Sequence, residues 1–216
     1  MIRIGILGDI GSGKTYVAKN FGYPVFNADY EVSKLYKKNR VIGHNTDIAG
    51  FQNSIQNSEY NLEKKEVLIL GAGGVVPSII FALTKMKPSK IMISNRTKEK
   101  AENIKRLFKH IEIIEWGKIS NFDMVINATS LGLKKDDNLN LNFSSISGKK
   151  FFYDVIYNPS ETNFLKIGKD LGNQTLNGKL MFIYQALSAF NIWHGLRPDV
   201  DENVIKLLDK WLELEF

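Results

Sequence analysis

Two glycine-rich loops of different design lie in the first half of this chain. The first spans residues 8–15 with the sequence GDIGSGKT, and the second spans residues 71–74 with the sequence GAGG. Each loop follows an apolar segment that predicts a buried strand and precedes a segment that predicts a helix. Such a loop can hold phosphate, because its glycines let backbone N–H groups converge where the helix N-terminus carries partial positive charge. The stretch between the two loops is too short for the remainder of a complete mononucleotide-binding domain.

The first loop fits the mononucleotide P-loop pattern in full, with a strand predicted over residues 2–7 and a helix over residues 14–21. Backbone N–H groups would cradle phosphate, the lysine would neutralise outer phosphate charge, and the threonine hydroxyl could ligate Mg²⁺. The residues concerned are Gly11, Ser12, Gly13, Lys14 and Thr15. ATP with Mg²⁺ is therefore a candidate ligand of this loop, against the alternative of a chance glycine-rich turn.

Phosphoryl transfer also needs a positioned base, and Asp29 at the end of the next predicted strand is the candidate. The alternative role of Asp29 is a helix N-cap. Residues 1–40 resemble the start of dephospho-CoA kinase, through the segments IGILG at 4–8, IGSGK at 10–14 and VFNAD at 25–29. The resemblance implies that Asp29 is the acceptor-activating base, although Asn27 stands where that family has an aspartate. It stops near Arg40, so the segment is interpreted as a truncated kinase-like fragment.

The second loop has the features of a dinucleotide site, and the strand that follows distinguishes NAD from NADP. An NAD site usually places Asp or Glu at the end of that strand to hold the ribose 2′-hydroxyl. Here the strand over residues 90–94 ends in Asn95, Arg96 and Thr97. A guanidinium and a hydroxyl suit a 2′-phosphate, and no acid repels it. The sequence predicts NADP, against the alternative of a helix-capping turn with one surface arginine.

From residue 66 onward, short apolar segments alternate with helical ones, a pattern typical of a parallel sheet covered on both faces. Strands are predicted over residues 67–70, 90–94, 111–115, 123–127, 151–155 and 173–176. Helices are predicted over residues 75–86, 98–108, 162–171, 180–194 and 202–214, and an earlier one, capped by Thr46 or Asp47, runs to Gln56. The expected fold is α/β, a Rossmann-type parallel sheet with helices on both faces, preceded by a truncated P-loop β-α-β segment. The expected domains are residues 1–40 and 41–216.

Residues 43–216 resemble shikimate dehydrogenase through a series of motifs in the same order. The segment GHNTDIAGF at 43–51 resembles the family's Asn-Thr-Asp-x-x-Gly-Phe segment. The further matching segments are residues 71–75, 95–97, 127–130, 154–159, 178–181 with 185–186, and 190–195. The resemblance implies NADP-dependent interconversion of 3-dehydroshikimate and shikimate.

The resemblance also implies roles for single residues. Asp47 would be the catalytic carboxylate, and Tyr157 and Gln185 would contact the substrate, shikimate or 3-dehydroshikimate. The cofactor would be lined by Gly71, Ala72, Gly73, Gly74, Val75, Asn95, Arg96, Thr97, Thr129, Val155 and Gly178. In the family a lysine of an N-terminal substrate domain is paired with the aspartate, and no lysine upstream of Asp47 stands in that motif. Shikimate turnover is therefore expected to be very poor, because proton transfer and substrate orientation are each worth orders of magnitude in rate.

Composition excludes several other functions. The formal net charge of +6 is spread along the chain without a basic stripe interleaved with aromatics, so nucleic acid is not an expected partner. Cysteine is absent, and the three histidines share no metal-ligand spacing, so no metal site is predicted. No apolar run approaches transmembrane length, which predicts no membrane association and a cytoplasmic location. Apolar positions in the C-terminal helices make self-association an expectation, and a non-catalytic NADP-binding module and a P-loop phosphotransferase are the alternative functions.

Overall fold

The computed structural model describes residues 43–134 and 136–215. The chain divides into two compact units, residues 1–44 and residues 45–216, and the fold below is that of the second unit. The P-loop, Asp29 and the strands and helices predicted for residues 1–40 lie outside the described residues.

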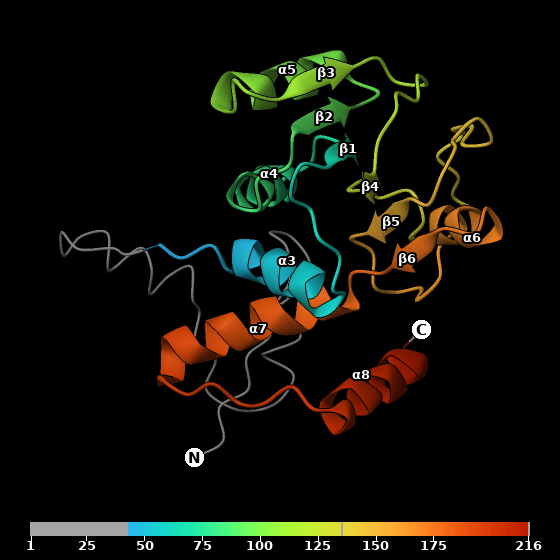
Figure 1. The fold of residues 1–216 in the computed structure, drawn as a ribbon. Coiled ribbons are helices and arrows are strands. Elements are labelled where there is room, and N and C mark those ends of the chain that lie inside the picture. Colours follow the sequence, from blue (N-terminus) through green and yellow to red (C-terminus); the bar gives the residue numbers. More distant parts are fainter. Residues whose placement is uncertain (1–42, 135, 216) are drawn as a thin grey trace. The chain divides into compact units, whose positions relative to one another are not determined.

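The second unit is built on one sheet of six parallel strands in the order β3-β2-β1-β4-β5-β6 (Figure 1). The strands are β1 (Glu66–Leu70), β2 (Lys90–Ser94), β3 (Glu112–Ile114), β4 (Met124–Asn127), β5 (Phe151–Asp154) and β6 (Gln174–Leu176). The central pairings are in register from Val67 opposite Ile91 to Leu70 opposite Ser94, and from Val67 opposite Met124 to Leu70 opposite Asn127. This confirms the Rossmann-type α/β fold and each predicted strand from residue 66 onward, to within one or two residues at the ends.

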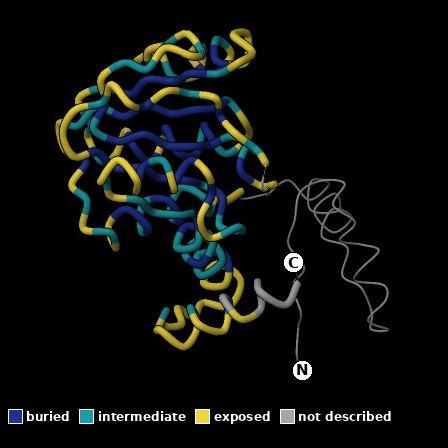
Figure 2. The backbone as a smooth tube through the Cα atoms, turned by 90° about the vertical axis from the view of Figure 1, so that its right-hand side faces the viewer, coloured by how far each residue is buried: buried dark blue, intermediate teal, exposed yellow. Residues whose placement is uncertain are grey.

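The central strands are buried on both faces, as continuous apolar runs in parallel sheets predict. Successive side chains of a strand point to opposite faces, so Val67 and Ile69 enter one apolar cluster while Leu68 and Leu70 enter another. The buried strands run between exposed outer layers in Figure 2. The sheet is therefore packed between two apolar layers, one on each face.

Four helices contribute to the cluster on the first face. They are α3 (Thr46–Asn57), α4 (Val76–Lys85), α5 (Lys98–Leu107) and α7 (Lys179–His194). Helix α3 begins differently from the prediction: its N-cap is Asn45, whose side chain accepts from the Asp47 N–H at 3.1 Å, rather than Thr46 or Asp47. Asn45 is the cap because its backbone is extended, which places the side-chain oxygen near the N–H groups of the first turn.

The second face is covered by one helix and by loops. Helix α6 (Asn163–Asp170) packs there together with the long connection over residues 128–150. Phe143 of that connection lies 5.3 Å from Phe152 and 6.0 Å from Phe164 between ring centroids, in edge-on contacts. An aromatic cluster thus takes the place that a crossover helix fills elsewhere in the sheet.

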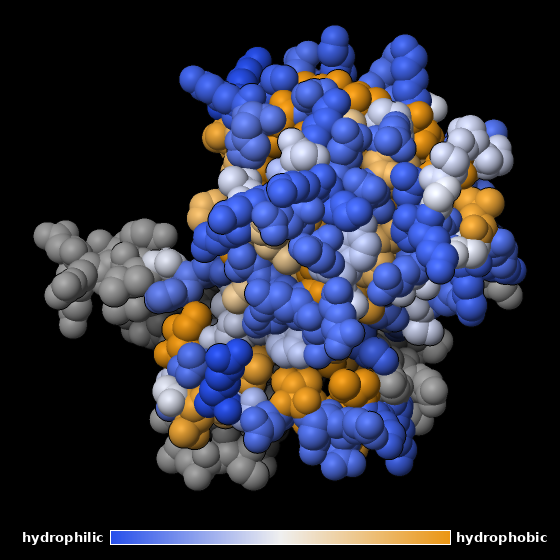
Figure 3. All heavy atoms as spheres, viewed as in Figure 1, coloured by the Kyte–Doolittle hydropathy of each residue, from blue (hydrophilic) through white to orange (hydrophobic). Residues whose placement is uncertain are grey.

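The last helix, α8 (Glu202–Glu215), follows α7 after a short connection. The two helices and their connection border an apolar groove of about 310 Å³, lined in part by Phe182, Phe190 and Val204. Figure 3 shows apolar side chains reaching the surface in this region, where Trp193 is 63% exposed. No helix of the described residues is both long and apolar enough to cross a membrane.

Candidate functional site

The strand order reverses between β1 and β4 at the carboxyl edge of the sheet. From β1 the chain moves outward through β2 to β3, and then returns to β4 beside β1 and moves outward the other way. In open parallel sheets, ligands bind in the crevice outside the carboxyl ends of the strands at such a switch point. The loops that follow β1 and β4 therefore border the candidate site.

The loop after β1 is shaped by its glycines. Gly71 has φ +110°, and a Cβ there would lie 2.7 Å from the Ala128 carbonyl oxygen, so no other residue fits without displacement. A Cβ at Gly74 would meet nothing within 4 Å, and one at Gly73 would meet only the Ala128 oxygen at 3.8 Å. Helix α4 starts at this point, and its N-cap Val75 offers no side-chain cap. Open space in front of uncapped helix N–H groups is what an anionic phosphate requires.

The turn after β2 presents hydrogen-bond donors and cations. The Asn95 side chain donates to the Thr97 carbonyl oxygen at 2.7 Å, which fixes the turn. Thr97 is the N-cap of α5 and makes no side-chain cap bond to that helix. Arg96 and Lys100 are exposed beside it. The turn therefore combines a guanidinium, a hydroxyl and a helix N-terminus, with Glu99 as the acid of the first turn.

A buried polar network joins the carboxyl ends of β4 and β5. Asp154 is fully buried and accepts hydrogen bonds from the Thr162 hydroxyl at 2.6 Å, the Ile156 N–H at 3.0 Å and the Asn127 amide at 3.1 Å. Burial raises the pKa of the Asp154 carboxyl to about 6, although these hydrogen bonds lower it. The group is thus ionised at neutral pH without a cation among its partners. Sequence reasoning missed this network, whose signal is a polar residue at the last position of two neighbouring apolar strands.

Helices α3 and α7 cross closely beside this edge. A Cβ on Gly50 would lie 2.7 Å from the Met181 carbonyl oxygen and 2.9 Å from Cβ of Gln185, so glycine permits the approach. Asp47 lies in the first turn of α3, partly exposed, one helical turn before Gly50. The close crossing therefore brings the helix that carries Asp47 against the helix that carries Gln185.

Tyr157 meets the same part of α7. Its ring stacks on Phe182 with centroids 4.6 Å apart, and the Gln185 side chain donates to the Phe182 carbonyl oxygen at 3.0 Å. Gly178, buried at the start of α7, donates its N–H to the Ile156 carbonyl oxygen at 3.0 Å. The structure thus places Tyr157 on the Phe182 side chain and the Gln185 side chain on the Phe182 main chain, in one part of α7.

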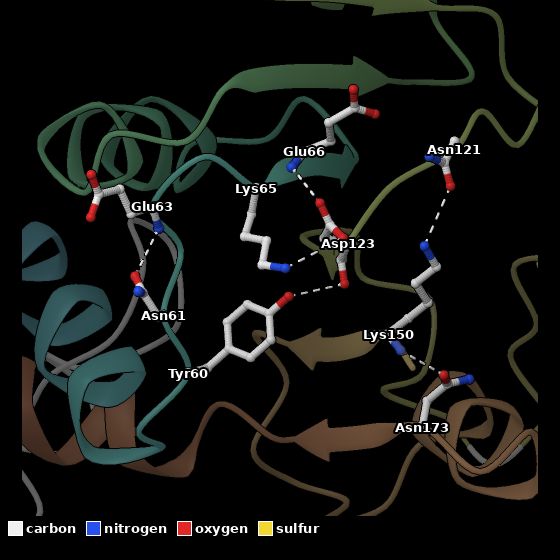
Figure 4. A network of polar contacts seen from close by, with 9 residues as sticks. All are labelled: Tyr60, Asn61, Glu63, Lys65, Glu66, Asn121, Asp123, Lys150 and Asn173. Carbon is white, nitrogen blue, oxygen red and sulfur yellow. Dashed lines mark hydrogen bonds and ion pairs between the residues drawn. The ribbon is translucent and has the colours of Figure 1, made fainter. Parts of the chain in front are cut away.

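The opposite edge of the sheet carries a separate polar network (Figure 4). The Asp123 carboxylate accepts from the Glu66 N–H at 2.9 Å and lies 3.8 Å from the Lys65 ammonium, while the Tyr60 hydroxyl donates to the Asp123 carbonyl oxygen. Burial and the Asp123 charge raise the pKa of Tyr60 to about 12. These groups satisfy one another, so this edge is structural.

Comparison with known proteins gives the family. The family model described as shikimate / quinate 5-dehydrogenase matches residues 53–154. The chain is 58% identical over 179 residues to shikimate dehydrogenase (NADP(+)) of Pelagibacter ubique, a match that covers 82% of this chain and 68% of that protein. The chain belongs to the shikimate dehydrogenase family.

Solved structures of known proteins agree with the fold. Shikimate 5-dehydrogenase of Thermus thermophilus, solved with NADP(H) and shikimate, is 29% identical with a TM-score of 0.67, over 74% of this chain and 60% of that one. A 5-ketofructose reductase of Gluconobacter is 35% identical with a TM-score of 0.71, over 82% of this chain and 65% of that one. The chain thus spans 60–68% of the length of these proteins. The interpretation of residues 1–40 as a kinase-like fragment stays a prediction.

Several of the family's motif residues directly follow the carboxyl ends of strands of the sheet. The Gly71 loop follows β1, the Asn95 turn follows β2 and Thr129 follows β4, and these three strands are neighbours in the sheet. Val155 follows β5, and Gly178 begins α7. In the described residues no group of three or more His, Asp or Glu side chains could hold a metal ion.

Proposed function

We propose that this member of the shikimate dehydrogenase family binds NADP(H) at the switch point between β1 and β4. The observation that carries the proposal is the open space over Gly73 and Gly74 in front of the uncapped N-terminus of α4, which a pyrophosphate would occupy. Gly71, Ala72 and Val75 shape the loop, and backbone N–H groups there bind the phosphates.

The Asn95 turn would select NADP over NAD. The Arg96 guanidinium and the Thr97 hydroxyl bind a ribose 2′-phosphate, and the uncapped N-terminus of α5 adds favourable charge. Lys100, which sequence reasoning did not single out, lies exposed in the first turn of the same helix and adds a further cation. Asn95 itself holds the turn in shape through its bond to Thr97.

The nicotinamide half would extend between Thr129, Val155 and Gly178, where the loops after β4 and β5 meet the start of α7. When bound, NADP⁺ would be the hydride acceptor at this position. Val155 and Gly178, whose backbones pack so closely that a Cβ on Gly178 would strike the Val155 carbonyl oxygen, would line the place of the ring.

The substrate proposed for this site is shikimate or 3-dehydroshikimate. Tyr157 and Gln185 would donate hydrogen bonds to its hydroxyl groups, and Asp47 would serve as the carboxylate that accepts a proton or holds a proton donor. The proposal is supported by the convergence of Tyr157 and Gln185 on Phe182 and by the close crossing of the Asp47 helix. The expectation that turnover is very poor stays a prediction, since it depends on a lysine motif and not on the described site.

One sample tests both halves of the proposal. NADPH is titrated into the full chain while tryptophan fluorescence is recorded, and shikimate oxidation with NADP⁺ is then assayed on the same preparation. Saturable NADPH binding with very slow oxidation is the expected result. The absence of saturation at millimolar NADPH contradicts the cofactor proposal, and brisk oxidation contradicts the expected impairment.

A second candidate function is nucleotide binding by residues 8–15, which is supported by the full P-loop pattern. Lys14 would contact the outer phosphates of ATP, and Asp29 would activate an acceptor as in dephospho-CoA kinase. We expect Lys14→Ala to abolish Mg-dependent ATP binding and to leave the NADPH titration unchanged. If the unaltered chain fails to bind ATP at millimolar concentration, this candidate is ruled out.

A further inference from the structure

The carboxyl ends of β4 and β5 are joined by a carboxylate whose hydrogen-bond donors, among the residues that the structure describes, are all neutral. The partners of Asp154 are the Thr162 hydroxyl, the Ile156 N–H and the Asn127 side-chain amide, whose nitrogen lies 3.1 Å from both carboxylate oxygens. An ionised carboxylate can only accept hydrogen bonds. Asp154 therefore requires that Asn127 present its NH₂ group, and not its carbonyl oxygen, toward β5.

This orientation of Asn127 shapes the turn over residues 129–131. The Asn127 carbonyl oxygen accepts from the Thr129 N–H at 3.1 Å and from the Thr129 hydroxyl at 2.7 Å. The amide nitrogen also donates to the Leu131 carbonyl oxygen at 3.1 Å, and the Leu131 N–H donates to the Thr129 hydroxyl at 3.0 Å. One amide group thus determines the position of both ends of the turn.

The turn lies directly beside the dinucleotide loop. The Ala128 carbonyl group, one residue before the turn, is the group that a Cβ on Gly71 would strike at 2.7 Å. On the other side, Gly132 has φ +124°, and a Cβ there would lie 3.1 Å from the Thr162 methyl group. The network therefore connects the loop after β1, the turn after β4 and the segment after β5, which are the three walls of the proposed cofactor site.

We infer that Asp154 is a positioning residue for the nicotinamide half of this site, acting through Asn127 on the turn that carries Thr129. The inference rests on the proposed binding of NADP(H) for its functional consequence, while its structural part concerns the protein alone. The carboxylate makes no contact with the cofactor in this account. Its role is to hold the Asn127 amide firmly in the orientation that the Thr129 N–H and the Leu131 carbonyl oxygen also require.

Asp154→Asn tests this role, because it keeps the shape of the side chain and removes its acceptor-only character. Whichever carboxylate oxygen is replaced by NH₂, the new donor lies 3.1 Å from the Asn127 amide nitrogen, which then has one acceptor on residue 154 in place of two. Two donors this close repel each other, so the Asn127 amide is held less firmly. The turn that this amide bonds, through the Thr129 N–H and the Leu131 carbonyl oxygen, should therefore open more readily.

Two measurements, both at pH 7.5, test the expected effect of Asp154→Asn on the turn and on the cofactor site. The first is hydrogen exchange at the Thr129 and Leu131 amides in the cofactor-free protein, recorded by NMR with selective ¹⁵N labelling. We expect both amides to lose protection at least tenfold in Asp154→Asn. The second is NADPH affinity from fluorescence titration, which we expect to weaken at least tenfold.

Asp123→Asn is the matched control, because it alters a half-buried carboxylate that accepts a backbone N–H at the opposite edge of the sheet. It should lower the melting temperature and leave both readouts within twofold of the unaltered protein. If Asp154→Asn does not fold, Asn127→Ser removes the amide itself and leaves Asp154 with Ile156 and Thr162, and both readouts should change in the same way.

The outcomes separate the inference from the proposed function. If the unaltered protein does not bind NADPH, the proposed function fails, and the exchange of Thr129 and Leu131 still decides whether Asp154 positions the turn. If Asp154→Asn, or Asn127→Ser in its place, retains amide protection and NADPH affinity within twofold, the inference is overturned. If amide protection and NADPH affinity also fall in Asp123→Asn, the change in Asp154→Asn reflects general destabilisation, and the inference is overturned as well.

Discussion

Gly74→Ala should separate cofactor binding from folding more cleanly than any other single change. An added Cβ would meet no atom of the protein within 4 Å, and the residue lacks the positive φ that strains a side chain. Replacing glycine by alanine at such a position stabilises proteins by about 0.4–1 kcal/mol, because it reduces the freedom of the unfolded chain. The free energy of unfolding of the variant should therefore stay the same or rise.

The same methyl group would occupy the space proposed for the pyrophosphate. A hydrogen bond between a backbone N–H and a charged group contributes about 1.5–3 kcal/mol. Loss of one such bond is enough to raise the dissociation constant of NADPH about tenfold, and loss of two would raise it by about two orders of magnitude or more. Affinity and stability should thus move in opposite directions.

The assay pairs NADPH titration with urea unfolding on the same preparation. Gly71→Ala serves as the contrast, because its Cβ would strike the Ala128 carbonyl oxygen and φ +110° is unfavourable for alanine, so stability and affinity should fall together. If Gly74→Ala binds NADPH within twofold of the unaltered chain, the pyrophosphate does not use this space and the placement of the cofactor is wrong.

Three further changes test separate parts of the account. Arg96→Ala should weaken NADPH binding by about 1.5–3 kcal/mol while NADH binding changes little, and an equal loss for both would contradict a 2′-phosphate contact. Gly50→Ala should lower the free energy of unfolding in urea by about 2 kcal/mol net, because overpacking against the Met181 carbonyl group outweighs the gain in helix propensity, and an unchanged midpoint would show that α3 and α7 can separate without cost. The pKa of the Asp154 carboxyl rises from 3.8 to about 6 on folding, so the folded state binds the carboxyl proton more tightly than the unfolded chain does. The stabilisation that this bound proton gives is complete below pH 4 and is lost as the pH rises through 6. Relative to Asp154→Asn, the free energy of unfolding should fall by about 3 kcal/mol over that range, and a flat difference would mean that the pKa is not raised.

The sequence predicted the sheet well because each buried strand is a continuous apolar run between turn signals. Val67 to Leu70 and Ile91 to Ile93 are such runs, and a parallel sheet needs no side-chain detail to be recognised. The Asn95 turn was predictable for a similar reason, since the residue types at the end of the second strand carry the chemical signal.

Other features depend on contacts between residues far apart in the chain. Asp154 and Asn127 are separated by 27 positions, and the polar residue that ends each strand does not reveal that the two side chains bond to each other. The cap of α3 was assigned to Thr46 or Asp47, because capping by Asn45 depends on its extended backbone, which also lets its amide donate to Ser78 on α4 at 2.9 Å. The connection over residues 128–150 covers a face of the sheet through Phe143, a role that a segment without helical periodicity does not reveal.

The central claim is that this chain carries the NADP-binding module of its family, and a paired titration tests it most directly. NADPH and NADH are titrated separately into the full chain by isothermal calorimetry at low ionic strength. The account predicts one saturable site per chain, with NADPH bound at least about tenfold more tightly than NADH. Equal affinity for the two dinucleotides, or no heat of binding for NADPH at millimolar concentration, would contradict it.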